Sequence, residues 1–340
     1  MKTLITGAAG FIGGYVVEEF LEAGYEVVGV DNFSKYGRSQ PRCLNHPRYR
    51  FVEGDAKDAA FLTELLADCE HFVAAAAMIG GIAYFHRLAY DLLAENERIM
   101  AAACDAAIEA HRRGGLEKIT LLSSSMVFEN AASFPSEEGD ELRSPPPSST
   151  YGFQKLAGEY FVRGAWQQYQ LPYTVVRPFN CVGIGERRAR ADIEILSGDV
   201  KLALSHVVPD LAQKVLRGQD PLHILGDGSQ VRHYTYGGDL ARGIRVCVEH
   251  PAARNEDFNI STAQPTTVLE LAEAIWHKVH GEDRPFRYVC DEPFPHDVPF
   301  RSPSVEKAKR LLGFEATTTL DDILDEVIPW IRQQIDLGTI

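Results

Sequence analysis

Three glycines at intervals of three residues constrain the start of this chain more than any other feature. They lie between a short apolar run and an amphipathic stretch, in the segment Thr6–Gly13. This spacing suits a strand that turns sharply into a helix: Gly7 permits the turn, Gly10 lets the backbone approach a pyrophosphate, and Gly13 lets helix and strand pack closely. The pattern therefore predicts a dinucleotide-binding site.

An aspartate at the end of the second predicted strand indicates which dinucleotide is bound. Asp31 lies 18 residues beyond Gly13 and is followed by Asn32. A carboxylate at this place accepts hydrogen bonds from the adenosine ribose and repels a 2′-phosphate, so the sequence favours NAD over NADP. Asp55 ends the third predicted strand, where two roles are open: a contact with adenine, or a turn or helix cap.

Short apolar runs alternate with amphipathic stretches through the first half of the chain. Strands are expected at Leu4-Ile5, Glu26–Val30, Tyr49–Val52, His71–Ala75, Lys118–Ser123 and Tyr173–Arg177. Helices are expected at Phe11–Ala23, Asp58–Leu66, Ala94–Arg112 and Tyr151–Tyr169. This alternation predicts a parallel sheet with helices on both faces, which is a Rossmann-type doubly wound α/β fold.

The second half is less regular and predicts a smaller mixed α/β lobe that binds the substrate. Its expected elements are helices at Val207–Leu216, Val268–Val279, Val305–Leu312 and Leu320–Gln334, and strands at Leu222–Leu225 and Phe258–Ile260. We expect residues 1–178, together with about 231–262, to form the dinucleotide-binding domain. Residues 179–230 and 263–340 are expected to form the lobe.

Charge and composition limit the partners of this chain. It carries 34 basic and 48 acidic residues, a net charge of −14, so we expect no broad binding to nucleic acid or to anionic membranes. Its six cysteines lie far apart, as is typical of reduced thiols, and the apolar run Phe72–Phe85 is too short to span a bilayer. Gly7 interrupts any signal peptide, which favours a cytoplasmic protein. No metal is expected, since His277 and His280 lack a third ligand at usable spacing.

A tyrosine and a lysine at the start of a predicted helix indicate chemistry on an alcohol. Tyr151 and Lys155 are four residues apart, which places the phenol and the ammonium on one helix face. Tyrosine, with a pKa of ~10, is a weak base at neutral pH, but a neighbouring lysine and a nicotinamide cation would lower that pKa. The serines Ser123–Ser125, at the end of a predicted strand, offer a hydroxyl that shares the alcohol proton.

These motifs occur together in a known order. The chain resembles the extended short-chain dehydrogenases/reductases, in their nucleotide-sugar epimerase/dehydratase branch. The resemblance runs nearly end to end and rests on Thr6–Gly13, Asp31-Asn32, Gly54-Asp55, Asn96, Ser123–Phe128, Tyr151–Lys155, Arg177–Asn180, Leu225–Arg232, Asp239 and Val305–Phe314. It implies an NAD-dependent enzyme that acts on nucleotide sugars. It also implies a homodimer formed through the helices Ala94–Arg112 and Tyr151–Tyr169.

The resemblance assigns roles by position. Ser124 would be the catalytic hydroxyl, Tyr151 the acid and base, and Lys155 the side chain that holds Tyr151 and the nicotinamide ribose. NAD would be bound by Gly7, Gly10, Phe11, Ile12, Gly13, Asp31, Asn32, Asp55, Ala56, Ala74, Ala75, Ala76, Asn96, Tyr151, Lys155 and Pro178. The substrate would be bound by Met78, Ser124, Ser125, Met126, Tyr151, Asn180, Arg187, Val207, Arg232 and Arg301. Asn180, Arg232 and Arg301 would hold its diphosphate, although each arginine has the alternative of a surface ion pair.

Met126 separates the reactions that this family catalyses. In the 4,6-dehydratases a glutamate stands at this position, and in 3,5-epimerases a cysteine does; both act on a proton at C5 or its neighbours. A thioether neither donates nor accepts such a proton. Met126 therefore favours oxidation and re-reduction at C4, a 4-epimerisation that needs only the serine, the tyrosine, the lysine and NAD.

The sequence indicates the identity of the substrate sugar less clearly than it indicates the type of reaction. Arg187, Arg188 and Arg190 lie near the expected pocket, and one of them, with Ser125, would suit the carboxylate of a uronic acid; the alternative is an exposed basic loop. We therefore expect a UDP-glucuronate 4-epimerase, followed by a UDP-glucose/UDP-galactose 4-epimerase. A nucleotide-sugar dehydratase or 4-keto reductase, and a non-catalytic NAD sensor, are the remaining alternatives.

Overall fold

The computed structural model describes five stretches of the chain. They are residues 1–80, 87–187, 195–202, 206–293 and 298–340 of 340. Arg188 and Arg190, which were candidates for binding a sugar carboxylate, lie outside the described residues.

A seven-stranded parallel sheet forms the centre of the molecule. Its strands, in spatial order, are β13 (Glu256–Ile260), β6 (Tyr173–Pro178), β5 (Lys118–Leu122), β4 (His71–Ala74), β1 (Lys2–Thr6), β2 (Glu26–Asp31) and β3 (Tyr49–Glu53). All neighbouring strands run parallel, and the order of the strands reverses between β1 and β4. The predicted Rossmann-type α/β fold is confirmed, and the reversal is where such sheets bind ligands.

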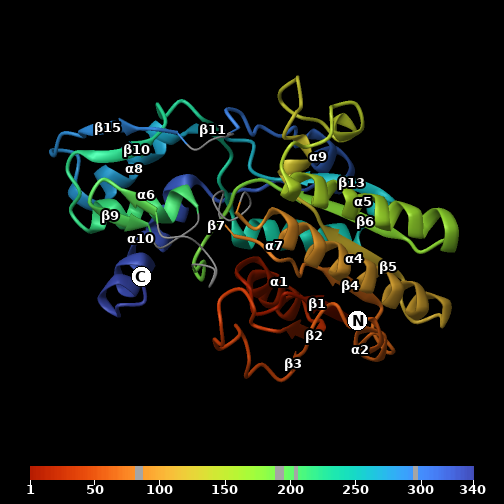
Figure 1. The fold of residues 1–340 in the computed structure, drawn as a ribbon. Coiled ribbons are helices and arrows are strands. Elements are labelled where there is room, and N and C mark those ends of the chain that lie inside the picture. Colours follow the sequence, from red (N-terminus) through yellow and green to blue (C-terminus); the bar gives the residue numbers. More distant parts are fainter. Residues whose placement is uncertain (81–86, 188–194, 203–205, 294–297) are drawn as a thin grey trace.

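Helices cover both faces of this sheet (Figure 1). One face packs on α1 (Phe11–Glu22), α7 (Gly237–Glu249) and α9 (Glu306–Leu312), and the other packs on α2 (Ala59–Leu65), α4 (Ala89–Arg112) and α5 (Thr150–Tyr169). Side chains of successive strand residues alternate between the two cores, as the pleat requires. Leu121 of β5 joins the core under α4 and α5, whereas Leu122 joins the core under α1 and α7.

A second body of helices packs at the end of the molecule opposite the N-terminus (Figure 1). It contains α6 (Val207–Leu216), α8 (Val268–His280), α10 (Leu320–Asp336) and the parallel strand pair β10 (Leu222–Leu225) and β15 (Tyr288–Asp291). These three helices share one apolar core, in which Trp276 is fully buried. The division of the chain into two domains at the stated boundaries stays a prediction.

The remaining elements are short strands and 3₁₀ turns outside the central sheet. They are the strands β7 (Cys181–Val182), β8 (Ile195–Ser197), β9 (Val200–Leu202), β11 (Val231–Arg232), β12 (Thr235–Tyr236) and β14 (Thr266–Thr267), and the 3₁₀ turns Ser125–Phe128, Asp140–Leu142 and Pro251–Ala253. β7 pairs with β12, β8 with β9, and β11 with β14.

Most predicted helices are present with small shifts of their ends. The helix predicted at Ala94–Arg112 begins at Ala89, one turn earlier. α7 was not predicted, because the two glycines at its start and the arginines within it obscured its pattern. The missed signal was the recurrence of Leu240, Ile244 and Val248 every four residues, which places all three in the core.

The core of the helical body should dominate its stability. Leu324 is fully buried among α6, α8 and α10, whereas Leu337, just beyond α10, is 66% exposed. We predict that Leu324→Ala lowers the free energy of unfolding by about 2–5 kcal/mol, because it leaves a cavity. Leu337→Ala should change it by less than about 0.5 kcal/mol. Urea unfolding of both variants checks this, and equal effects would contradict the assigned core.

Candidate active site

The turn between β1 and α1 has room for backbone only. Gly7 has a φ of +75°, and a Cβ added at Gly13 would lie 1.9 Å from the carbonyl oxygen of Gly7. α1 begins at Phe11 with Gly10 as its N-cap, and no side chain of the described residues caps its first turn. Backbone N–H groups at such a helix end bind phosphate well, so the turn fits a pyrophosphate.

Asp31 lies at the end of β2, beside this turn. Its carboxylate accepts hydrogen bonds from the backbone N–H of Ala9, at 3.1 Å, and of Phe33, at 2.7 Å. Burial raises the pKa of the Asp31 carboxyl, while these backbone bonds lower it in part. The carboxylate thus adjoins the glycine turn, where a ribose that follows the pyrophosphate would reach it.

Asp55, at the end of β3, takes a local role in this structure. Its carboxylate accepts a hydrogen bond from the backbone N–H of Lys57 at 3.0 Å, which closes a turn before α2. The helix cap itself is Asp58, which accepts from the N–H of Phe61. The Asp55 side chain is still 43% exposed, so its contact with adenine stays a prediction.

The loop after β4 is held in place from two sides. The hydroxyl of Thr6 accepts hydrogen bonds from the N–H groups of Ala75 and Ala76, both at 3.2 Å. The amide of Asn96, on α4, pairs with the N–H of Met78 at 2.7 Å and with its carbonyl at 2.9 Å. Asn96 was expected to contact NAD; in the structure its amide fixes the loop that lies across the glycine turn.

Ser124 and Tyr151 come together at the end of β5. Ser124 caps the 3₁₀ turn that follows the strand, where its hydroxyl accepts from the N–H of Met126 at 3.2 Å. Tyr151 is the second residue of α5, whose N-terminus is capped by Ser149. A hydrogen bond joins the Ser124 hydroxyl to the Tyr151 phenol, and both residues are buried.

Lys155 lies one helical turn beyond Tyr151 and is also buried. Its ammonium donates to the carbonyl oxygen of Leu122, the last residue of β5, at 3.0 Å. Burial lowers the pKa of Lys155 to about 8, while the charge of Glu159 raises it in part. The lysine is therefore fixed to the strand that carries Ser124.

The electrostatics of Tyr151 differ from the expectation. Burial raises the pKa of the phenol above its usual value, and this effect outweighs the hydrogen bond from Ser124 and the charge of Arg301, which lower it. Lys155 was expected to supply the lowering charge, but the cation that acts on Tyr151 here is Arg301. The phenol is thus held protonated by the protein alone.

A small cavity of about 10 Å³ lies beside Met126. Met126 is buried and packs against Tyr151 and Leu92. Ser125 and Arg301 line the pocket together with Met126, Phe128, Glu129, Phe134, Ser136, Phe179, Val298 and Phe300. The rings of Phe134 and Phe300 close its outer side, with their centroids 5.7 Å apart.

The other predicted substrate residues fall into two groups. The side-chain oxygen of Asn180 is buried and has no hydrogen-bond partner among the described residues, as a ligand contact requires. Arg232 is buried, and its guanidinium donates to the carbonyls of Val231 and Pro299, at 2.9 and 3.3 Å. Arg187, by contrast, is exposed. Val207 begins α6. Of the residues predicted to bind NAD, Ala56 and Ala74 are buried and Pro178 ends β6.

Two kinds of feature are absent from the described residues. Within them, no three His, Cys, Asp or Glu side chains are grouped as metal ligands would be. No helix in the described stretches has the length and apolar character that crossing a membrane requires.

Comparison with known proteins identifies the family. Residues 3–261 match the NAD dependent epimerase/dehydratase family, which is more than half of the chain. The chain belongs to this family. Its predicted membership, its enzymatic nature and NAD as its cofactor are thereby confirmed.

Relatives of this epimerase/dehydratase are similar over their full length. The UDP-glucose 4-epimerase of Lacticaseibacillus casei is 28% identical over 346 residues, covering 97% of this chain and 96% of the relative. The structure of Thermotoga maritima UDP-glucose 4-epimerase with UDP-glucose is 28% identical, with a TM-score of 0.79 and coverage of 98% and 100%. The structure of Bacillus cereus UDP-glucuronic acid 4-epimerase with UDP-glucuronic acid and NAD is 25% identical, with a TM-score of 0.80 and coverage of 98% and 99%. These relatives are UDP-sugar epimerases, which are isomerases.

NAD fits the residues that this epimerase/dehydratase presents. The glycine turn leaves space where any side chain would clash, and the N-terminus of α1 offers backbone N–H groups for the pyrophosphate. Asp31 adjoins that turn, and Lys155 lies with Tyr151 at the end of β5. When bound, NAD supplies a hydride acceptor and donor; the individual contacts of these residues with it stay predictions.

Sequence reasoning missed several residues that shape this site. Thr6 precedes the first glycine, and nothing in the sequence marks it as the anchor of the loop after β4. Phe134 and Phe300 come from segments 166 residues apart, so their contact has no local signal. Glu159 lies one turn after Lys155 on the same helix face, and this spacing was a usable signal.

The position of Asp31 predicts how a substitution changes cofactor choice. Asp31→Ser should weaken NAD binding about tenfold or more, because a charged hydrogen-bond acceptor is lost. The substitution should also reduce the preference for NAD over NADP, because the repulsion between the Asp31 carboxylate and a 2′-phosphate is removed. Calorimetric titration with both dinucleotides measures the two affinities.

Glu53→Gln is the matched control, since Glu53 pairs with Asp31 in register and is exposed. An unchanged NAD to NADP ratio in Asp31→Ser would contradict the assignment.

Proposed function

We propose that this family member is a UDP-sugar 4-epimerase and that its substrate is UDP-glucuronate. The observation that carries the reaction type is the thioether of Met126, which packs against Tyr151 on the sugar side of the site. A dehydratase or a C5 epimerase needs a proton donor or acceptor at this place, and methionine offers neither. Oxidation and reduction at C4 need no such group.

The residues at the end of β5 suffice for the proton transfers of this reaction. Tyr151, in its phenolate form, takes the proton of the C4 hydroxyl through the hydrogen bond that it shares with Ser124. Bound NAD would accept the C4 hydride and would return the same hydride to the opposite face after the 4-keto sugar has turned over in the site. Tyr151 would then give its proton back to the C4 oxygen, so a full cycle would leave both the enzyme and the cofactor unchanged.

The protein alone does not lower the pKa of the Tyr151 phenol enough for this role. Since burial raises the pKa of its phenol, the phenolate needs positive charge nearby. Arg301 supplies one such charge, and the nicotinamide ring supplies another when NAD is bound. Proton abstraction is thus linked to the oxidised form of the cofactor.

The uronate specificity is supported by two polar side chains beside Met126, Ser125 and Arg301, which line the same small cavity. With position 126 facing C5 of the sugar, as the family resemblance implies, the group on C5 would lie near these two side chains. A guanidinium and a hydroxyl are suited to a carboxylate. Glu129 also lines the pocket, but its carboxylate is engaged by the N–H and hydroxyl of Ser149, at 2.9 and 2.8 Å. Arg301 thus serves the sugar, whereas the sequence had suggested that it holds the diphosphate.

The diphosphate of the substrate is proposed to lie farther from Tyr151 than the sugar does, on the side of the substrate-binding lobe. Asn180 and Arg232 are the candidates, because the buried side-chain oxygen of Asn180 has no hydrogen-bond partner among the described residues and Arg232 carries positive charge. The uridine position involves residues near Val207 at the start of α6.

A nuclear magnetic resonance experiment tests this function. Purified enzyme is incubated in D₂O with UDP-glucuronate, UDP-glucose or UDP-N-acetylglucosamine, each without added reductant. We predict conversion of UDP-glucuronate to UDP-galacturonate with no deuterium at C4 or C5, because the hydride returns internally and Met126 exchanges no proton. Turnover of UDP-glucose alone would support the neutral-sugar alternative. Deuterium at C5, or loss of water, would instead indicate a dehydratase or a C5 epimerase.

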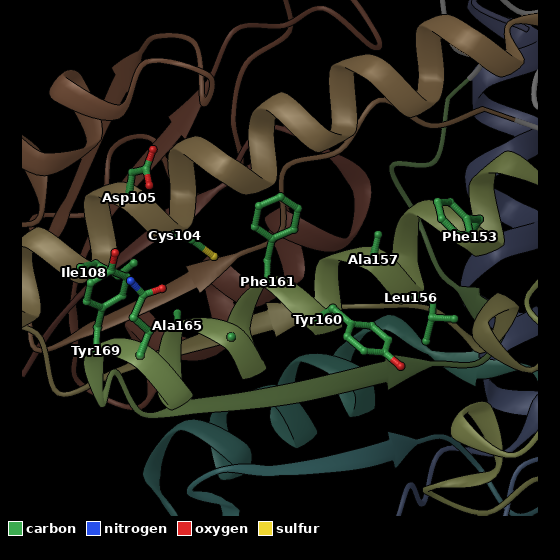
Figure 2. Close-up of a pocket in the computed structure, with 12 residues that line it drawn as sticks. Cys104, Asp105, Ile108, Phe153, Leu156, Ala157, Tyr160, Phe161, Ala165 and Tyr169 are labelled. Carbon is green, nitrogen blue, oxygen red and sulfur yellow. The ribbon is translucent and has the colours of Figure 1, made fainter.

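A homodimer is proposed on the face formed by α4 and α5. A groove of about 640 Å³ runs along these two helices. The residues that line it, drawn in Figure 2, are Cys104, Asp105, Ile108, Phe153, Leu156, Ala157, Tyr160, Phe161, Gly164, Ala165, Gln168 and Tyr169. Phe153, Tyr160 and Phe161 are 46%, 59% and 37% exposed, which is unusual for clustered aromatic residues. Two copies of a helix pair with such a stripe form a four-helix bundle about a two-fold axis.

This interface predicts the effect of a charge in the groove. Tyr160→Glu should convert the dimer to a monomer, because the two-fold axis places two carboxylates in one apolar contact. Tyr288→Glu is the control, since Tyr288 is an exposed aromatic residue, 43% accessible, on β15 far from the groove. Light scattering during gel filtration gives the mass of each. A monomeric wild type, or a Tyr160→Glu variant that stays dimeric, would contradict the assignment.

A cytoplasmic location is proposed from the state of the thiols. All six cysteines are free in the structure, and Cys69, Cys104 and Cys247 are buried. Burial raises the pKa of these three thiols to about 12, so they are inert. Proteins of reducing compartments typically have such thiols.

A further inference from the structure

A buried carboxylate lies one helical turn beyond Lys155 and takes no part in the chemistry described above. Glu159, on α5, has no exposed surface. Its Oε1 accepts from the hydroxyl of Ser123 at 2.7 Å and from Nε of Arg177 at 2.8 Å. Its Oε2 accepts from Nη2 of Arg177 at 2.7 Å and from Nη2 of Arg163 at 3.2 Å. All four contacts are short enough to fix the carboxylate in one orientation.

Two hydrogen bonds join α5 to the residues that directly precede Ser124. Lys155 donates to the carbonyl of Leu122, and Ser123 donates to Glu159. The two helix residues are one turn apart, and the two strand residues are adjacent and directly precede Ser124. Together these bonds fix the position of α5 along its axis and its rotation about that axis. They thereby fix the position of Tyr151 relative to Ser124.

The far side of Glu159 belongs to a larger network of ion pairs. Arg177, on β6, is fully buried and also contacts Asp257 of β13 at 2.7 Å and Glu141 at 2.9 Å. Arg163 contacts Glu141 at 3.0 Å, and Lys307 contacts Asp257 at 2.9 Å. Lys307 also contacts Glu256 at 2.8 Å, so four carboxylates face three cations. A buried network of this kind resists the loss of any single charge.

Glu159 also acts on Lys155 through space. Among the described residues it is the one charged side chain that affects the ammonium, raising its pKa against the effect of burial. The ammonium also donates a hydrogen bond to the Leu122 carbonyl of β5. The other carboxylates of the network are not among the groups that shift the pKa of Lys155.

We propose that Glu159 is a positioning residue for the catalytic pair: it ties the helix turn that carries Lys155 to the strand end that carries Ser124, and it places a negative charge beside the Lys155 ammonium. The proposal deepens the proposed function, because it explains how Tyr151 and Lys155 are held for proton transfer. It concerns the cofactor side of the site and does not depend on which sugar is bound.

The test compares two buried carboxylates of the same network. Glu159→Gln removes the charge beside Lys155 but keeps the side-chain volume and an oxygen for Ser123. Glu141→Gln removes a charge from the same arginines but touches neither Ser123 nor Lys155, so it measures the purely structural effect. For both variants and the wild type, NAD affinity by calorimetry and turnover of UDP-glucuronate are measured from pH 6 to pH 10.

The expected result is a change in the alkaline limb of the pH profile. A raised pKa keeps Lys155 charged to higher pH, so loss of the Glu159 charge should move the fall in NAD affinity and in kcat to lower pH by about one unit. Glu141→Gln should leave both limbs in place. Equal shifts in the two variants, or no shift in Glu159→Gln, would overturn the proposal and leave Glu159 a purely structural residue.

A second variant tests the tie to the strand separately and covers the case in which Glu159→Gln does not fold. Ser123→Ala removes one hydrogen bond to Glu159 and keeps every charge. We expect kcat to fall by about tenfold to a hundredfold with little change in KM and no shift of the alkaline limb, since Tyr151 is displaced but Lys155 keeps its charge. A kcat within twofold of wild type would contradict the positioning role.

The NAD measurements separate this proposal from the proposed function. If UDP-glucuronate is not turned over, NAD affinity as a function of pH still ranks Glu159→Gln against Glu141→Gln. A shift confined to Glu159→Gln would then support the role of Glu159 while the sugar assignment fails.

Discussion

The joint between α5 and the end of β5 is the contact on which the proposed chemistry depends. Tyr151 and Lys155 are on the helix, Ser124 is on the strand end, and the bond from Lys155 to the Leu122 carbonyl fixes one to the other. A slip of the helix by a single residue would move Tyr151 by about 1.5 Å, which is enough to break its hydrogen bond with Ser124. The parallel sheet therefore matters for function mainly because it gives α5 a fixed place to dock.

The contact between α5 and the end of β5 lies between a cofactor side and a proposed sugar side, which need different side chains. On the cofactor side, the glycine turn excludes side chains so that backbone N–H groups can face a pyrophosphate. On the proposed sugar side, the thioether of Met126 would leave C5 without a proton donor, while the charge of Arg301 lowers the pKa of Tyr151 in part. Burial raises the pKa of this phenol, and the charge of a bound nicotinamide ring would oppose that effect. In the proposed mechanism, proton abstraction would therefore be limited to the complex in which the hydride has an acceptor.

Features that depend on local pattern could be predicted from the sequence. The central strands and the helix at Val207–Leu216 follow from apolar periodicity, and the pairing of Tyr151 with Lys155 follows from helical spacing. The glycine turn predicts its own geometry, because only glycine tolerates the close approach at Gly13. What could not be predicted depends on contacts between distant segments: the pocket wall of Phe134 and Phe300, and the charge of Arg301 beside Tyr151. α7 is the exception, since its pattern was present but was obscured by glycine and arginine.

The central claim is that one hydride leaves and re-enters C4 within the same active site. It is tested most directly with UDP-glucuronate that carries deuterium at C4, incubated in ordinary water with the enzyme and without added NADH. The account predicts UDP-galacturonate that retains the deuterium at C4, because the cofactor returns the hydride that it took. Loss of the label to water, or its appearance at another carbon, would contradict oxidation and re-reduction at C4.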